Sequence, residues 1–165
     1  YNQKNYSKTM EYAEKVLATA SIDDRIKSDA HIMIARSAIK TNNEAKAKEA
    51  YVIVQKIASG ERAAEAWYYD AYFKNKEQAY EASSKTIQTL VKDFSSYKEW
   101  AGKGLLIMAD NFYALEDAYQ ANYILENIIK NFGAYPEIVE KAKVEQTIIK
   151  QKEARSNSSI NPEGN

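Results

Sequence analysis

Residues 97–132 read YKEWAGKGLLIMADNFYALEDAYQANYILENIIKNF, and this stretch decides the fold. Apolar side chains recur three and four residues apart on both sides of the polar pair Glu116-Asp117. They are Leu105, Met108, Ala109, Phe112 and Leu115 before the pair, and Ala121, Ile124, Leu125, Ile128 and Ile129 after it. This spacing puts the apolar side chains on one side of an α-helix. Because a short connection joins two helices of similar length, residues 97–132 are predicted to form an antiparallel helical hairpin.

Short polar breaks divide the rest of the chain into segments that are rich in good helix formers. We therefore predict an all-α fold of eight helices, at residues 3–19, 23–41, 44–58, 61–75, 77–93, 97–114, 117–131 and 136–155. Ser21 with Asp24 is interpreted as a capping box at the start of the second helix. The polar residues 156–165 are predicted to form a disordered tail.

The helical pattern repeats along the chain. The small residues Ala35, Ala71 and Ala109 are separated by 36 and 38 residues. Further columns recur at the same spacings, namely Thr9, Ala47, Ser83 and Ala121; Ala13, Tyr51, Ile87 and Leu125; and Val16, Val54, Leu90 and Ile128. Small residues let the two helices of a hairpin approach closely, and large ones fill the space to the next hairpin. Such a chain gains its stability from stacking of neighbouring hairpins.

On these columns the chain resembles the tetratricopeptide repeat (TPR) family, whose unit is a helix pair of about 34 residues. The resemblance covers residues 3 to 133. It implies a right-handed α-α superhelix of three hairpins (about 23–58, 61–93 and 97–131), preceded by a half-repeat (3–19) and closed by a capping helix (136–155). The repeats here are longer than the family's, they lack the proline that often ends a family repeat, and Lys74 stands where the family has an aromatic residue.

The repeat length is most similar to that of bacterial cell-envelope TPR proteins of the Tol-Pal coordinator and outer-membrane assembly lipoprotein type. That resemblance implies a place in the periplasm or at the outer membrane of a Gram-negative bacterium, with the cytoplasm as the alternative. The chain begins with Tyr1 and with half a repeat. We therefore expect it to be a fragment of a longer TPR protein.

Few residues of the sequence suggest catalysis or metal binding. The chain has no Cys, and its one histidine, His31, is interpreted as a packing residue. The acidic pairs Asp23-Asp24 and Glu116-Asp117 are interpreted as helix-start residues that complement the helix dipole. Asp70 and Lys74, four residues apart, either pair with each other or mark a local shift of register. We therefore predict that the protein is not an enzyme and that it uses no cofactor and no metal.

Charge and hydropathy limit the classes of partner that the chain is expected to bind. Lys and Arg together number 23, as do Asp and Glu, so the net charge is zero. This balance excludes binding to nucleic acid or to an anionic membrane through bulk charge. No apolar run approaches the ~20 residues of a membrane span. The prediction is a protein or peptide partner, no nucleic acid, and no direct membrane insertion of this segment.

In the TPR family the first helix of each repeat lines a concave groove. The resemblance implies a partner-binding groove formed by Ile32, Arg36, Ile39, Lys40, Glu65, Tyr68, Tyr72, Lys76, Lys103, Leu106, Asp110 and Tyr113. Aromatic and aliphatic residues surrounded by charges of both signs are typical of protein-binding surfaces. Tyr68 and Tyr72 share a helix face and are the expected anchors.

The predicted function is a non-enzymatic scaffold that binds a protein or an extended peptide in this groove. Two alternatives remain. One is a module that binds a glycan or another small ligand through the tyrosine-rich groove, because aromatic rings suit the faces of sugars. The other is a purely structural spacer.

Overall fold

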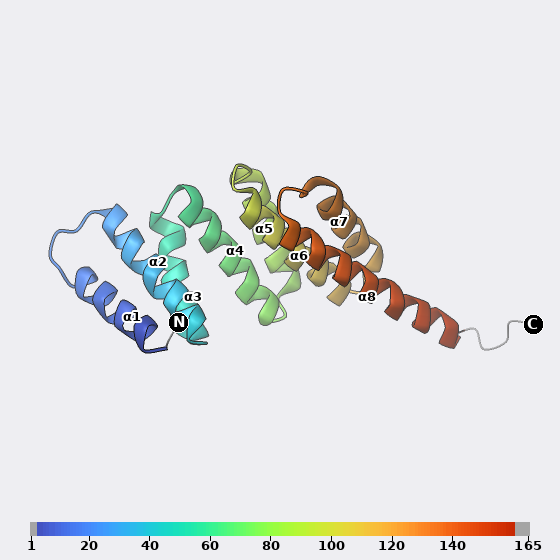
Figure 1. Ribbon diagram of the computed structural model, residues 1–165, viewed down its shortest axis with the longest axis horizontal. Coiled ribbons are helices and arrows are strands. Elements are labelled where there is room, and N and C mark those ends of the chain that lie inside the picture. Colours follow the sequence, from blue (N-terminus) through green and yellow to red (C-terminus); the bar gives the residue numbers. More distant parts are fainter. Residues whose placement is uncertain (1–2, 161–165) are drawn as a thin grey trace, which may run out of the picture.

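The computed structural model describes residues 3–160, and this part of the chain forms eight α-helices and no strand (Figure 1). The helices are α1 (Gln3–Leu17), α2 (Asp24–Lys40), α3 (Glu44–Ile57), α4 (Gly60–Lys76), α5 (Tyr80–Asp93), α6 (Lys98–Ala114), α7 (Ala118–Asn131) and α8 (Pro136–Ile160). The prediction of an all-α fold is confirmed. Seven of the eight helices end within two residues of their predicted ends.

Three local expectations are wrong. The fifth helix begins at Tyr80 and not at residue 77, because Glu77 and Gln78 form the turn that ends α4. The second helix is capped by Asp23, whose side chain accepts a hydrogen bond from the amide of Ile26 at 2.8 Å, and not by Ser21, which lies in the turn before it. The last helix runs to Ile160, beyond the predicted end at 155, because adding residues to a formed helix costs little and the first helix breaker is Pro162. The predicted tail from 161 lies outside the described residues.

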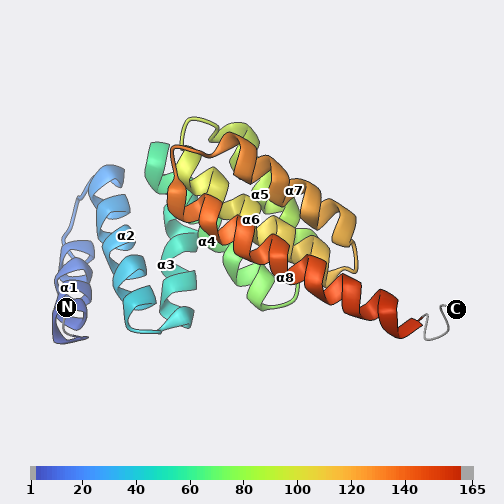
Figure 2. The ribbon, with the colours of Figure 1, turned by 45° about the vertical axis from the view of Figure 1, so that its right-hand side comes forward.

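Helices that are neighbours in the sequence pack against each other from α1 to α8. In addition α4 packs on α6, and α6 packs on α8, so alternate helices lie side by side in this half of the molecule (Figure 2). The molecule is elongated, with α1 at one end and the C-terminal end of α8 at the other (Figure 1). Helices α4 and α6, which both carry predicted groove residues, therefore lie next to each other.

The turns inside the three hairpins share one backbone conformation. Asn42, Gln78 and Glu116 have φ values of 55°, 61° and 63°, and they are spaced by the same 36 and 38 residues as the side-chain columns. In each turn the amide of the next residue donates to the carbonyl five residues before it, at 2.8–2.9 Å. This is the Schellman ending, which satisfies the last carbonyls of a helix. The repeat is therefore present in the backbone as well as in the side chains.

The connections between hairpins are not all alike. After α5 and after α7, the amides of Tyr97 and Tyr135 donate to the carbonyls of Phe94 and Phe132, at 2.9 and 2.8 Å. The connection from α3 to α4 is shorter and enters α4 through Gly60, whose φ is +65°. Glycine adopts this conformation at no steric cost, and a Cβ at this position would lie only 3.0 Å from the Tyr97 hydroxyl, so the start of α4 favours glycine.

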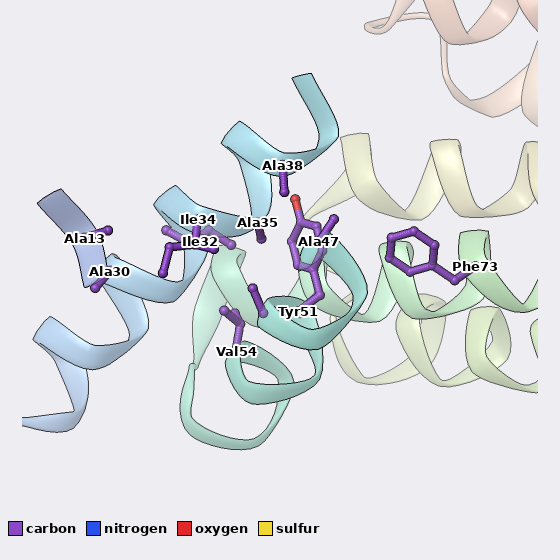
Figure 3. Packing of buried hydrophobic residues seen from close by; sticks show 12 residues of the cluster. Ala13, Ala30, Ile32, Ile34, Ala35, Ala38, Ala47, Tyr51, Val54 and Phe73 are labelled. Atoms are coloured by element: carbon purple, nitrogen blue, oxygen red, sulfur yellow. The ribbon is translucent and has the colours of Figure 1, made fainter. Parts of the chain in front are cut away.

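The small residues of the repeat are buried where helices cross. Ala35, Ala71 and Ala109 have no exposed surface, and neither do Ala47, Ser83 and Ala121. Figure 3 shows Ala35 and Ala38 of α2 lying against Tyr51 of α3 in the first core cluster, which spans α1 to α4. A second cluster joins α6, α7 and α8.

Candidate binding surface

Two of the twelve predicted groove residues are buried, which corrects their assignment. Ile32 lies in the first core cluster, because its position on α2 faces the neighbouring helices rather than solvent. Glu65 is only 2% exposed, because its carboxylate is bound on the inside of the stack. The other ten predicted residues are exposed or half-buried. Their role in binding stays a prediction.

Glu65 joins the first hairpin to the second. Arg36 of α2 donates to its carboxylate from Nε at 2.9 Å and from Nη2 at 2.5 Å. The hydroxyl of Tyr51 on α3 donates to Glu65 Oε1 at 2.8 Å. Burial, and then the nearby Glu65 charge, raise the pKa of Tyr51 well above its usual range. A buried carboxylate held by these donors fixes how α2, α3 and α4 meet.

An aromatic row crosses the stack from α3 to α6. The ring of Tyr69 stacks on Tyr51 with 4.3 Å between centroids, and Tyr68 lies 5.0 Å from Tyr69 and 5.4 Å from Trp100. Burial raises the pKa of Tyr68, which fits a ring enclosed by its neighbours. Tyr72 lies at the end of the row, 5.9 Å from Tyr69. Tyr68 is therefore half-buried within this row, and its role as a binding anchor stays a prediction.

Two cations lie over rings on this surface. Lys76 Nζ lies 5.6 Å from the Tyr72 ring, and it also pairs with Glu44. Lys103 Nζ lies 4.5 Å from the Trp100 ring. Both distances are within cation–π range. The aromatic row thus ends in polar, solvent-facing groups on α4 and α6.

A polar network holds the predicted groove residue Asp110 in place. Asn75 Nδ2 on α4 donates to Asp110 Oδ2 and to Asn111 Oδ1 on α6, each at 2.8 Å. Asn111 is fully buried and donates to Ser83 Oγ on α5 at 2.9 Å. Of the two possibilities predicted for Asp70 and Lys74, an ion pair or a shift of register, the ion pair forms, with Lys74 Nζ 2.7 Å from Asp70 Oδ2. These bonds lock α4, α5 and α6 together.

An apolar hollow of about 650 Å³ lies between α6 and α8, and we call it the α6–α8 hollow. Its floor is formed by Leu106, Val144 and Ile148, and its charged rim by Glu137, Glu140, Lys141 and Glu145. Val144 is 52% exposed and Ile148 is 45% exposed. The sequence analysis predicts a capping helix here but does not single out this exposed apolar pair. The signal for it was the spacing of four residues, which puts both side chains on one face.

Glu145 is the half-buried carboxylate of this hollow. Burial, and then the charge of Asp110, raise the pKa of Glu145 to about 7. Both effects disfavour the ionised carboxylate. The α6–α8 hollow therefore has a carboxyl group whose charge changes close to neutral pH.

A second hollow, of about 520 Å³, lies at the other end between α1, α2 and α3. His31 and Ile34 line it from α2, and the ion pair of Glu14 with Lys46 bridges α1 and α3 at its edge. His31 is half-buried, and its burial lowers its pKa. It lies beside this hollow rather than in the centre of the core.

Among residues 3–160 no group of three or more His, Asp or Glu side chains could hold a metal ion. The same part of the chain has no helix that is long and apolar enough to cross a membrane. Comparisons with protein-family models, with curated proteins and with solved structures find no match for this chain.

Proposed function

We propose that this chain is a TPR-like scaffold that binds another protein or a peptide, without catalysis, on the side of the stack formed by α2, α4 and α6. The proposal includes a right-handed superhelix of three hairpins closed by α8. Support comes from the buried small residues and the hairpin turns, which recur with the same spacings.

The observation that carries the proposal is the position of Asp110. This predicted groove residue of α6 accepts a hydrogen bond from Asn75 of α4, and its charge acts on Glu145 of α8. Asp110 therefore links α6 to α4 and lies near α8, and α2 is tied to α4 by the pair of Arg36 with Glu65. A partner that lies across this surface contacts several helices at once, which is how repeat proteins build extended binding surfaces.

The composition of this surface supports a protein partner. Tyr72, Leu106 and Tyr113 supply aromatic and aliphatic area, while Lys76 and Asp110 supply charges of opposite sign. Interfaces between proteins combine such apolar centres with a charged, hydrated rim. Affinity on such surfaces concentrates in a few aromatic or aliphatic anchors.

Site-specific cross-linking tests the proposal. The photo-cross-linker p-benzoylphenylalanine replaces Tyr72 in one variant of the full chain and Leu106 in another. The control variants carry it at Tyr119 and Tyr123 of α7, which are 78% and 56% exposed. After illumination in an extract of the source cells, we expect one common partner from Tyr72 and Leu106 and none from α7. A partner cross-linked only from α7 would refute the proposed surface.

A further inference from the structure

We propose that the α6–α8 hollow binds a basic amphipathic helix of the partner protein. The inference rests on the proposed function, because the hollow is the C-terminal end of the same surface. It goes further by specifying the chemistry of the bound segment: two aliphatic side chains one helical turn apart, flanked by lysine or arginine.

The first argument is the unpartnered apolar ridge on α8. Ile138, Ala142 and Ile149 bury one face of this helix against α6 and α7. Val144 and Ile148 form a separate ridge, about half exposed, which faces the hollow together with Leu106. Side chains four residues apart form the rows that pack into the grooves of a neighbouring helix. The shape of the ridge therefore fits a helical segment.

The second argument is the charge of the rim. Among the residues that line the hollow, Glu137, Glu140 and Glu145 outnumber Lys141 by three to one, and the charge of Asp110 on α6 acts on Glu145. No ion pair in residues 3–160 includes any of these five groups. An acidic rim around an apolar floor attracts a cationic partner and repels an anionic one.

Several cations on α2, α4 and α6 already have acidic partners within the chain: Arg36 binds Glu65, Lys76 binds Glu44, and Lys103 binds Glu99. Such pairs are satisfied before any partner arrives. The carboxylates that line the hollow have no ion pair of this kind in the described part of the chain, so an added lysine or arginine can pair with them.

Like charges interact at Glu145 and Asp110. They lie on α8 and α6, the charge of Asp110 acts on Glu145, and Asn75 of α4 contributes only a neutral amide to Asp110. An ammonium or guanidinium group placed beside them would favour the ionised form of both. This is why the proposal specifies a basic segment and not merely an apolar one.

The test uses three fluorescein-labelled helical peptides of about 16 residues. In the first peptide, Leu residues three and four positions apart lie on one face of the helix, and Lys and Ala occupy the other positions. The second keeps the Leu and replaces Lys by Glu. The third keeps the Lys and scatters the Leu around the helix. Binding to the full chain is measured by fluorescence anisotropy at pH 8, at low and at moderate salt.

We expect the first peptide to bind at least about ten-fold more tightly than either control peptide. Val144→Asp should weaken it about ten-fold or more, whereas the matched control Tyr119→Asp on α7 should leave it unchanged. Glu140→Gln with Glu145→Gln should weaken it several-fold and reduce its salt dependence, and Glu81→Gln on α5 should do neither. Circular dichroism checks that each variant is folded.

Equal binding of the first two peptides, or equal effects of Val144→Asp and Tyr119→Asp, would overturn the inference. So would self-association of the chain that Val144→Asp abolishes, because a second copy would then occupy the hollow. The cross-linking at Tyr72 separates this failure from that of the proposed function. If the peptide fails but Tyr72 captures a partner, only the basic segment is refuted; if the peptide binds but Tyr72 captures nothing, the wider surface is refuted.

Discussion

Glu145→Gln should stabilise the protein at pH 8 and leave its stability unchanged at pH 4.5. In the folded chain the pKa of Glu145 is raised from 4.5 to about 7, by burial first and by Asp110 second. Between pH 4.5 and about pH 7 the folded state keeps a proton on Glu145 that the unfolded state has lost. The free energy of unfolding therefore falls as the pH rises through this interval. Glutamine is neutral throughout and removes the fall.

The size of the effect follows from the same two values. A pKa that moves from 4.5 to about 7 corresponds to roughly 3 kcal/mol between the two protonation states when nothing screens the charge. Glu145 is only half-buried, and solvent screening reduces the effect. We expect Glu145→Gln to raise the free energy of unfolding by about 1–2 kcal/mol at pH 8. Asp110→Asn should give a smaller gain, because the charge of Asp110 is the lesser cause.

Urea unfolding followed by circular dichroism, at pH values from 4.5 to 8, measures this difference. Glu140→Gln is the matched control, because Glu140 is exposed on the same helix. Its stability relative to the wild type should not change with pH. The reasoning is wrong if Glu145→Gln gains nothing at pH 8, or if its advantage grows as the pH falls.

Three further changes test the packing. Arg36→Met leaves the buried Glu65 carboxylate without its cation and should destabilise the protein by about 2–3 kcal/mol in urea unfolding. Arg36→Met with Glu65→Gln removes the buried charge but keeps an acceptor for the Tyr51 hydroxyl, so it should recover part of this loss. Gly104→Ala places a methyl group 3.0 Å from Leu90 Cδ2 and should cost about 1–2 kcal/mol in the same assay; unchanged stability would contradict the tight packing at this position. Ending the chain after residue 135 removes the apolar cover of the second core cluster, and we expect aggregation in sedimentation velocity; a monomer with unchanged melting would contradict the role of α8 as a cap.

The helices and the buried small residues could be predicted because both depend on local spacing. Apolar residues three and four apart mark a helix whatever its neighbours are, and the repeat columns identify the faces that meet. The conformation of Asn42, Gln78 and Glu116 was not foreseen, because none of them is glycine. Only their common spacing, once the turns are known, shows that they are equivalent.

The site could be predicted less well because it depends on partners distant in the sequence. Glutamate is usually a surface residue. The burial of Glu65 requires Arg36, which lies 29 residues earlier, and Tyr51, which lies 14 residues earlier. The α6–α8 hollow requires Leu106 to meet Val144 and Ile148 across two helices. No pattern within one helix encodes such a meeting.

The contacts between alternate helices differ along the molecule, and this difference affects where the proposed partner would gain affinity. Between α4 and α6 the helices pack directly, and the bonds from Asn75 to Asp110 and Asn111 fix their register. Between α2 and α4 the connection relies on the shorter turn at Gly60 and on the side-chain bridge from Arg36 to Glu65. A surface that is already rigid loses less entropy when it binds. We therefore expect the proposed partner to gain most of its affinity from the part of the surface from α4 to α8, which includes the α6–α8 hollow.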